Sequence, residues 1–215
     1  MSLTLVIGNR NYSSWSLRPW LAMKHAGVAF EELRVPLNQP DTKARILRHS
    51  PSGRVPCLVD GALAVWDSLA ICEYVNEQYA GGSLWPQTVA ERARARSVTA
   101  EMHSGFAALR THMSMDIRGR HPDRGAAAAA RPDVGADIAR IQSIWTDCMT
   151  ASGGPFLFGR FSIADAFYAP VVTRFRTYAV ALPARLSAYA DAVFALPAMQ
   201  EWTEAAAAEP ETLDD

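Results

Sequence analysis

Hydrophobic and polar positions change between strand-like and helix-like spacing over the first eighty residues. Residues 3–8 form a short, apolar, β-branched run that predicts a buried strand. A helix should follow and end at Ala26, because Gly27 suits the left-handed position beyond a helix end. Pro19 is tolerated in the first turn of a helix, so the helix should begin near Ser16. Residues 11–14 would then form an exposed loop in front of the helix.

The rest of this region predicts a small mixed sheet. Residues 30–37 read as a second strand, and residues 55–60 and 62–66 flank Asp60-Gly61, a hairpin signal. Residues 68–79 have the apolar stripe of a helix. A helical crossover between the first two strands implies that they pair in parallel, whereas the hairpin implies antiparallel pairing.

Beyond the break Gly-Gly-Ser-Leu-Trp-Pro at residues 81–86, the spacing becomes helical. Helices are predicted over residues 87–116, 134–151, 163–180, 184–195 and 198–208. The alanine run 126–130 is either a short helix or a mobile connector, and the acidic tail 209–215 should be frayed. We therefore expect two domains, at residues 1–82 and 87–215, the second of them all-helical.

Composition removes several classes of function. The 215 residues include 49% hydrophobic and 20% charged residues, which excludes wholesale disorder. Lys plus Arg total 21 against 22 for Asp plus Glu, so nothing points to nucleic acid or a membrane surface as partner. Three widely spaced cysteines without a C-x-x-C motif make a disulfide framework or a metal site improbable. Without a signal peptide or a long apolar run, the chain is expected in the cytoplasm.

Two motifs carry candidate binding chemistry. In Ser-Pro-Ser-Gly-Arg54-Val55-Pro56-Cys-Leu, a proline near the start of a strand cannot donate to the ladder. If Val55–Pro56 were cis, Val55 would expose its N–H and C=O to an extended peptide, although about one X–Pro bond in twenty is cis. In Trp-Asp67-Ser68-Leu, a helix start offers free amides to a carboxylate, and Asp67 offers an anion to an ammonium group. The alternative is plain helix capping.

Together with Phe161-Ser-Ile-Ala-Asp165-Ala-Phe in the helical half, these motifs resemble the cytosolic glutathione transferases over nearly the whole chain. The Ser13-Ser-Trp-Ser-Leu-Arg18 stretch is most similar to the zeta-type enzymes, which include maleylacetoacetate isomerases. The resemblance implies an α/β thioredoxin-like N-terminal domain, an all-α C-terminal domain and a homodimer. It implies a cis Val55–Pro56 bond, with Val55 pairing to the cysteinyl unit of the cosubstrate glutathione. Asp67 and Ser68 match the pair that binds the γ-glutamyl group, and Arg54 lies in the loop along the tripeptide.

The resemblance also implies a hydroxyl or thiol near the first helix that holds the glutathione thiolate. Lowering a thiol pKa by two units takes about 2.7 kcal/mol, roughly one charge-assisted hydrogen bond and a helix N-terminus. An ungapped match at Trp15 to the zeta-like Ser-Ser-Cys-Ser-Trp pattern departs from it at Asn11 and Tyr12. The candidate catalytic residues are therefore Ser14, Ser13 and Asn11, with Tyr12 behind them. Alternatively, both serines merely cap the helix.

Other signals are open to two interpretations. Ser162-x-x-Asp165 has capping-box spacing and reads as a folding element. His103 and His112 are nine residues apart, which is no metal-ligand spacing and favours packing or surface roles. Several apolar residues could line an acceptor pocket or form core, namely Met102, Phe106, Leu109, Met113 and Met115. Arg118 and Arg120 could meet an anionic acceptor or be solvated.

Three functions follow from these motifs. The first is a transferase in which the glutathione thiolate attacks a small apolar electrophile. The second is a glutathione-dependent cis–trans isomerase of the maleylacetoacetate type. The third is a glutathione-binding protein without turnover, which the departures at Asn11 and Tyr12 motivate.

Overall fold

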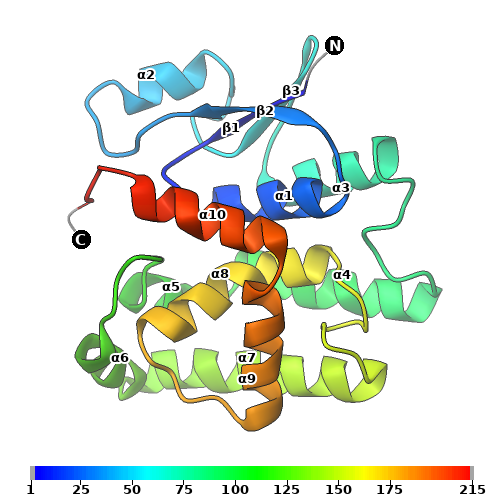
Figure 1. The fold of residues 1–215 in the computed structure, drawn as a ribbon, viewed down its shortest axis with the longest axis vertical. Coiled ribbons are helices and arrows are strands. Elements are labelled where there is room, and N and C mark those ends of the chain that lie inside the picture. Colours follow the sequence, from blue (N-terminus) through cyan, green and yellow to red (C-terminus); the bar gives the residue numbers. More distant parts are fainter. Residues whose placement is uncertain (1–2, 214–215) are drawn as a thin grey trace.

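The computed structural model describes residues 3–213 and contains a four-stranded mixed sheet (Figure 1). The strands are β1 (Leu3–Ile7), β2 (Phe30–Arg34), β3 (Cys57–Asp60) and β4 (Leu63–Val65), in the order β2-β1-β3-β4. β1 pairs in parallel with β2, and β3 is antiparallel to β1 and β4. The predicted crossover and hairpin are thus confirmed. β2 ends before residue 37, because Pro36 has no N–H to continue the ladder.

Three helices cover the sheet: α1 (Ser14–His25), α2 (Thr42–Leu47) and α3 (Ser68–Gln78). Successive residues of β1 point to opposite faces, as the period of two in a strand requires. Leu5 and Ile7 join the main core with α1 and α3, while Val6 packs with Ile46 of α2 in a second, smaller cluster. α1 and α3 therefore lie on the face that the helical half of the chain covers.

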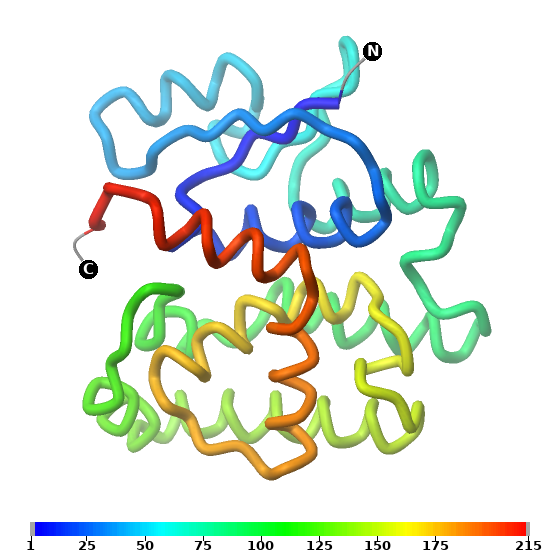
Figure 2. The backbone as a smooth tube through the Cα atoms, in the orientation of Figure 1, coloured from blue at the N-terminus to red at the C-terminus, as the bar shows by residue number. Residues whose placement is uncertain are grey.

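The second half of the chain is entirely helical. Its helices are α4 (Val89–Ser104), α5 (Ala107–His112), α6 (Pro122–Ala129), α7 (Pro132–Ser152), α8 (Ile163–Thr177), α9 (Ala184–Phe194) and α10 (Pro197–Ala208). Nearly every residue of α8 is buried, and α8 packs against both α1 and α4. α10 returns to α1, where the rings of Trp202 and Trp20 lie 4.9 Å apart, as the chain trace in Figure 2 lets one follow. We keep residues 1–82 and 87–215 as the proposed domain limits.

One predicted helix differs from the structure, and one open alternative is decided. Residues 87–116 form two helices, α4 and α5, because the chain turns at Gly105 and Phe106 adopts a left-handed φ of 60°. Of the two alternatives for residues 126–130, the short helix is confirmed, because residues 126–129 belong to α6. That helix rests against the end of α8: a Cβ on Gly125 would lie 1.9 Å from the carbonyl oxygen of Tyr178.

The entrance to α1 corrects two expectations. α1 begins at Ser14, with Ser13 as its N-cap, so Pro19 lies in the second turn rather than the first. Asn11, Ser13 and Ser14 are buried and do not form an exposed loop. The physical reason is long-range: residues 116–118 and Glu209 cover this stretch.

The tail is also different from the prediction. Residues 209–213 are ordered against the first half of the chain, and the side chain of Glu209 is only 4% exposed. Arg10, in the loop between β1 and α1, forms an ion pair with Glu209. Arg34 of β2 forms ion pairs with both Glu209 and Glu211. The end of the predicted tail, 214–215, lies outside the described residues.

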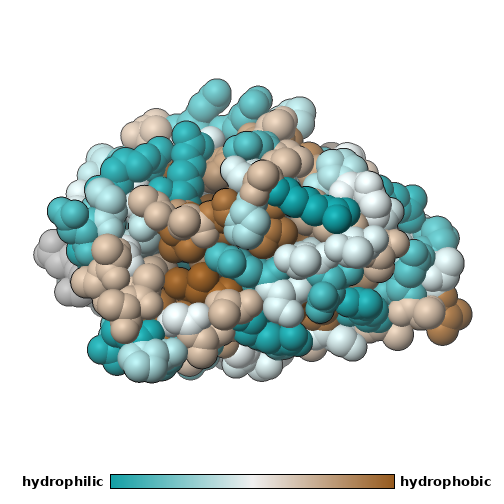
Figure 3. Space-filling model, turned by 90° about the horizontal axis from the view of Figure 1, so that it is seen from below, coloured by the Kyte–Doolittle hydropathy of each residue, from teal (hydrophilic) through white to brown (hydrophobic). Residues whose placement is uncertain are grey.

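The face remote from the sheet carries an apolar surface and a cavity without any of the predicted site residues. Figure 3 shows apolar side chains gathered in a hollowed part of the face remote from the sheet. A cavity of about 480 Å³ between α8 and α9, lined in part by Val172, Phe175, Val180 and Phe194, contains none of the predicted site residues. Among residues 3–213, no helix is both long enough and apolar enough to cross a membrane.

Candidate functional site

All five residues predicted to bind glutathione line one cavity of about 520 Å³, which we call the Val55 cavity. Its walls are Arg54, Val55, Pro56, Asp67 and Ser68, together with Trp15, Ser52 and Trp66. These side chains come from the loop before β3, from the junction of β4 and α3, and from the first turn of α1. The fold thus brings together two groups of residues, 54–56 and 67–68, with ten residues between them in the sequence.

The Val55–Pro56 peptide bond is cis, as the family resemblance implied. Val55 lies just before β3, which begins at Cys57. The main chain of Val55 makes no hydrogen bond to any group within the described part of the chain. Its N–H and C=O are therefore free to pair with an extended peptide in the cavity. A second cis bond joins Trp66 to Asp67, which no sequence signal had indicated.

At the start of α3, the Asp67 side chain caps the helix, whereas the Ser68 hydroxyl remains unused. The Asp67 carboxylate caps the helix, because its Oδ1 accepts from the N–H groups of Leu69 at 2.9 Å and Ala70 at 3.4 Å. Its Oδ2 lies 2.9 Å from His103 Nε2, and the side chain is still 51% exposed. The Ser68 hydroxyl, in contrast, is fully buried and has no hydrogen-bond partner among residues 3–213. Ser68 thus offers an unused donor beside a helix N-terminus, where an anion is favoured.

Ser13 and Asn11 are engaged in the structure of the loop. Ser13 Oγ accepts from Ser16 N–H at 3.4 Å and lies 2.8 Å from Ser16 Oγ, so this serine caps α1 as the alternative interpretation had it. Asn11 Nδ2 donates to Asp116 Oδ1 at 2.7 Å, and Asn11 Oδ1 accepts from Arg118 N–H at 2.9 Å. Burial opposes ionisation of Asp116, but hydrogen bonds from His121 and Asn11 lower its pKa overall.

Ser14 and Tyr12 instead lie on the wall of a second cavity of about 340 Å³, which we call the Tyr12 cavity. It is lined by Tyr12, Ser14, Trp15, Asn38, Arg110, Ser114, Met115, Arg174 and Leu213. Arg174 Nη2 donates to Ser14 Oγ at 3.3 Å, which leaves the Ser14 hydroxyl proton free to donate. Arg118 donates to the Tyr12 hydroxyl oxygen at 3.1 Å. Trp15 lines both cavities, so these hydroxyls lie beside the Val55 cavity.

Three arginines lie close to Trp15 and Ser14: Arg18 and Arg174 are buried, and Arg110 is half-buried. The guanidinium carbons of Arg18 and Arg110 lie 4.2 and 5.0 Å from its ring, and Arg174 joins them from α8. Burial, with repulsion from the other two, lowers the pKa of Arg18 to about 9. Burial, with repulsion from Arg110, lowers the pKa of Arg174 to about 10. The resulting positive potential favours an anion next to Ser14. Because the three residues come from α1, α5 and α8, no local spacing could have predicted their proximity.

The remaining sequence candidates have structural roles. Cys57, Cys72 and Cys148 are buried, and burial raises the pKa of each thiol, so none is a nucleophile in this site. Of the apolar residues considered for an acceptor pocket, only Met115 lines the Tyr12 cavity, and all five are buried in the core. His103 packs edge-on against Trp15, which agrees with a packing role, but also contacts Asp67. No group of three His, Cys, Asp or Glu side chains within residues 3–213 could hold a metal ion.

Comparison with known proteins assigns the chain to a family. Residues 12–78 match the family described as "Glutathione S-transferase, N-terminal domain", and residues 86–205 match "Glutathione S-transferase, C-terminal domain". A probable maleylacetoacetate isomerase of Caenorhabditis elegans is 32% identical over 100 residues, 46% of this chain and 46% of that protein. The chain covers less than half the length of the first curated relatives that it matches.

Solved structures agree over nearly the full length. A theta class glutathione S-transferase of Xanthomonas axonopodis pv. citri, with glutathione bound, is 28% identical and superposes with a TM-score of 0.64, covering 94% of this chain and 97% of that one. A bacterial zeta class maleyl pyruvate isomerase is 25% identical, with a TM-score of 0.73 and coverage of 99% and 100%. With both of its halves matched, the chain belongs to the glutathione S-transferase family.

Proposed function

We propose that this protein is a glutathione transferase that uses a hydrogen-bonded glutathione thiolate to attack a small electrophile. The observation that carries the proposal is the Val55 cavity, which joins a free Val55 main chain to the α3 N-terminus with its unused Ser68 hydroxyl. An extended tripeptide with an amino-acid end group needs these two features at once. Glutathione supplies the nucleophilic sulfur, and the chain supplies its orientation and its ionisation.

Each residue has a distinct task in this proposal. Val55 pairs with the cysteinyl main chain, and the Ser68 hydroxyl and the α3 amides receive the γ-glutamyl carboxylate. Asp67 is half exposed and keeps lone pairs for the ammonium group. Arg54, on the wall of the same cavity, borders the tripeptide from the loop before β3.

Ser14 is the residue that we propose as donor to the thiolate. Its hydroxyl oxygen already accepts from Arg174, so its proton can point to the sulfur, and the neighbouring arginines favour the anionic form. Ser13 and Asn11 contribute by fixing the loop, because their side chains are bonded to Ser16 and Asp116. Tyr12 is the competing donor, since its hydroxyl lies on the same cavity wall.

The experiment measures the thiol pKa of bound glutathione by ultraviolet absorbance of the thiolate. We expect a value well below the usual thiol pKa of about 8.5 in the wild type and a rise of about one to two units in Ser14→Ala. Tyr12→Phe is the matched comparison at the same cavity and should leave the thiol pKa within a few tenths of a unit. A rise in Tyr12→Phe alone would transfer the role to Tyr12. A wild-type thiol pKa equal to that of free glutathione would support a binding protein without turnover.

A second candidate function is isomerisation of a cis-dienyl diacid of the maleylacetoacetate type. The Tyr12 cavity favours it, because Arg110 and Arg174 on its wall suit an acceptor that carries carboxylates. The relatives named as isomerases point the same way. Direct assay on a maleylacetoacetate-type substrate separates the two functions. Turnover that depends on glutathione without consuming it would establish the isomerase, and inertness would leave the transferase.

We also propose that the protein acts in the cytoplasm as a homodimer. Large apolar side chains are exposed on β4 and at the start and end of α3, where Leu63, Trp66 and Tyr79 are each more than 40% accessible. Sedimentation equilibrium of the wild type should give twice the 23.5 kDa chain mass.

A further inference from the structure

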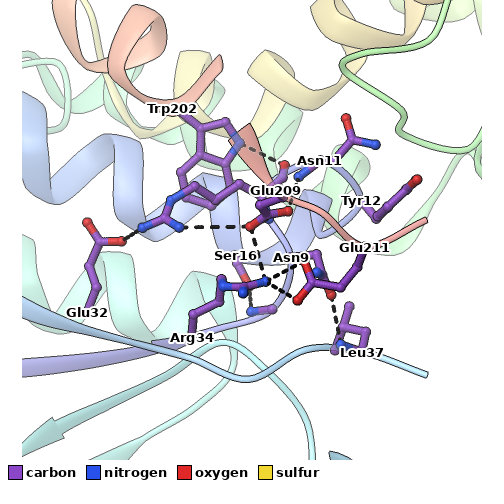
Figure 4. A network of polar contacts seen from close by, with 12 residues as sticks. Asn9, Asn11, Tyr12, Ser16, Glu32, Arg34, Leu37, Trp202, Glu209 and Glu211 are labelled. Atoms are coloured by element: carbon purple, nitrogen blue, oxygen red, sulfur yellow. Dashed lines mark hydrogen bonds and ion pairs between the residues drawn. The ribbon is translucent and has the colours of Figure 1, made fainter. Parts of the chain in front are cut away.

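The chain segment after α10 crosses the loop that leads into α1. Figure 4 shows Glu209 pointing into this loop, where its carboxylate accepts from Arg10 N–H at 2.8 Å and Asn11 N–H at 3.3 Å. The Glu209 side chain is 4% exposed, and the guanidinium groups of Arg10 and Arg34 lie 3.9 and 3.7 Å from its Oε1. A buried carboxylate with two main-chain donors and two cationic neighbours is held in a single position.

The same segment is fixed at two further points. Arg34 Nη1 donates to both carboxylate oxygens of Glu211, at 2.9 and 3.0 Å. Arg118 Nη1 donates to the main-chain oxygen of Glu209. Its Nη2 donates both to the main-chain oxygen of Glu211 and to the Tyr12 hydroxyl oxygen. One guanidinium thus joins the tail to a side chain of the Tyr12 cavity.

The main chain of the loop between β1 and α1 is hydrogen-bonded through both its N–H and its C=O groups. Trp202 of α10 donates to Arg10 C=O at 3.0 Å, opposite the bond from Arg10 N–H to Glu209. Asn11 C=O accepts from Ile117 N–H, opposite the bond from Asn11 N–H to Glu209. Loss of Glu209 would leave these two N–H groups without their acceptor, so we expect the loop to be held less firmly. Ser14 begins the helix three residues later, and Leu213 closes the wall of its cavity.

We propose that Glu209 is a positioning residue for Ser14, the donor that we propose for the thiolate at the start of α1. Glu209 also holds residues 209–213 in place, so that Leu213 lines the Tyr12 cavity, in which the acceptor would bind. This inference rests on the proposed transferase function. Glu209 lines neither the Val55 cavity nor the Tyr12 cavity, so it acts through the loop at Arg10 and Asn11. Leu213 contributes to the selection of the electrophile.

The test compares Glu209→Gln with the wild type and with Glu201→Gln. Glu201 lies on α10 and forms an exposed ion pair with Lys24 of α1, so this control removes one contact between the same two helices without touching the loop. Three quantities are measured: the dissociation constant of glutathione, the thiol pKa of bound glutathione, and kcat and KM for 1-chloro-2,4-dinitrobenzene as the probe electrophile.

We expect Glu209→Gln to keep glutathione affinity within about threefold, because the Val55 cavity is intact, and to raise the bound thiol pKa by about one unit with a roughly tenfold loss of kcat. Leu213→Ala should raise KM for the electrophile about threefold or more and leave the thiol pKa unchanged, as loss of a few apolar contacts predicts. Glu201→Gln should match the wild type in all three quantities.

The inference is overturned if Glu209→Gln lowers thermal stability but leaves the thiol pKa and kcat at wild-type values, since a purely structural role predicts that pattern. If Glu209→Gln does not fold, Arg34→Gln, which removes the partially exposed cation shared by Glu209 and Glu211, carries the test with the same expected direction. An unchanged thiol pKa in that variant would equally overturn it. A wild type that does not lower the thiol pKa at all would instead contradict the proposed function.

Discussion

At the scale of single residues, the position of a hydroxyl decides its chemistry. Ser13 and Ser14 are adjacent and both buried, yet Ser13 Oγ is occupied by the helix cap and Ser14 Oγ lies on a cavity wall with its proton free. Ser52 and Ser68 differ in the same way in the Val55 cavity. Ser52 Oγ bonds to Ser50 Oγ and Arg54 N–H, whereas Ser68 Oγ is unpartnered among the described residues.

Ser68→Ala should therefore weaken glutathione binding about tenfold, because a hydrogen bond to a charged carboxylate is lost. Ser52→Ala, at the same cavity, is the control and should change the dissociation constant less than threefold. Isothermal titration calorimetry with glutathione measures both. Equal effects of the two substitutions would remove Ser68 from the binding set.

Asp165 predicts a pH dependence of stability. Burial raises the pKa of this carboxyl to about 6, against the opposing effect of hydrogen bonds from Leu157 and Ser162. Because the folded-state pKa lies above the unfolded one, the unfolded chain releases its proton first, and this group's contribution to stability is lost as the pH rises from about 4 to 6. The difference in unfolding free energy between the wild type and Asp165→Asn, from urea titrations, should shrink across this range. A constant difference would contradict the raised pKa.

At the scale of elements, local sequence signals predicted the helices and strands whose causes are local. The Asp60-Gly61 turn, the left-handed Gly27 and the capping box of α8 are each decided by a few neighbouring residues, and the structure contains all three. The burial of Asn11 could not be predicted from neighbouring residues. Its partners Asp116 and Glu209 lie 105 and 198 residues further along the chain. The proximity of Arg18, Arg110 and Arg174 and the ordered tail could not be predicted either, because they too depend on contacts between distant parts of the chain.

The capping box of α8 gives a prediction at this scale. Ser162 N–H and Oγ both donate to Asp165 Oδ2, at 2.9 and 3.0 Å, inside a fully buried helix start. Ser162→Ala should lower the free energy of unfolding by about 1 kcal/mol, the usual loss for a helix cap. Ser104→Ala near the exposed end of α4 is the control and should change it by less than about 0.5 kcal/mol. Urea denaturation of both variants gives the comparison, and no change in Ser162→Ala would refute the capping role.

At the scale of the whole molecule, α1 is shared by the two halves. It packs against β1 and α3 on one side and against α8 and α10 on the other. The Trp20–Trp202 contact and the buried Arg174–Ser14 hydrogen bond cross this boundary. The core around α1 is therefore continuous, and neither half can lose its structure without exposing apolar surface of the other.

We expect the two halves to unfold together. In urea, two signals should give the same midpoint: far-ultraviolet circular dichroism, which reports mainly on the helical half, and the fluorescence of the six tryptophans, which include Trp20 and Trp202 at the boundary between the halves. The expectation fails if the two signals show separate transitions.

The ordered tail has a practical consequence for anyone who handles the protein. Leu3 starts β1 at the end of that strand remote from the loop at Arg10, whereas Leu213 lines the Tyr12 cavity. If the acceptor binds in the Tyr12 cavity as we propose, a fluorescent fusion attached after the tail should lower kcat/KM for the electrophile by crowding that cavity. The same fusion attached ahead of β1 should leave kcat/KM unchanged.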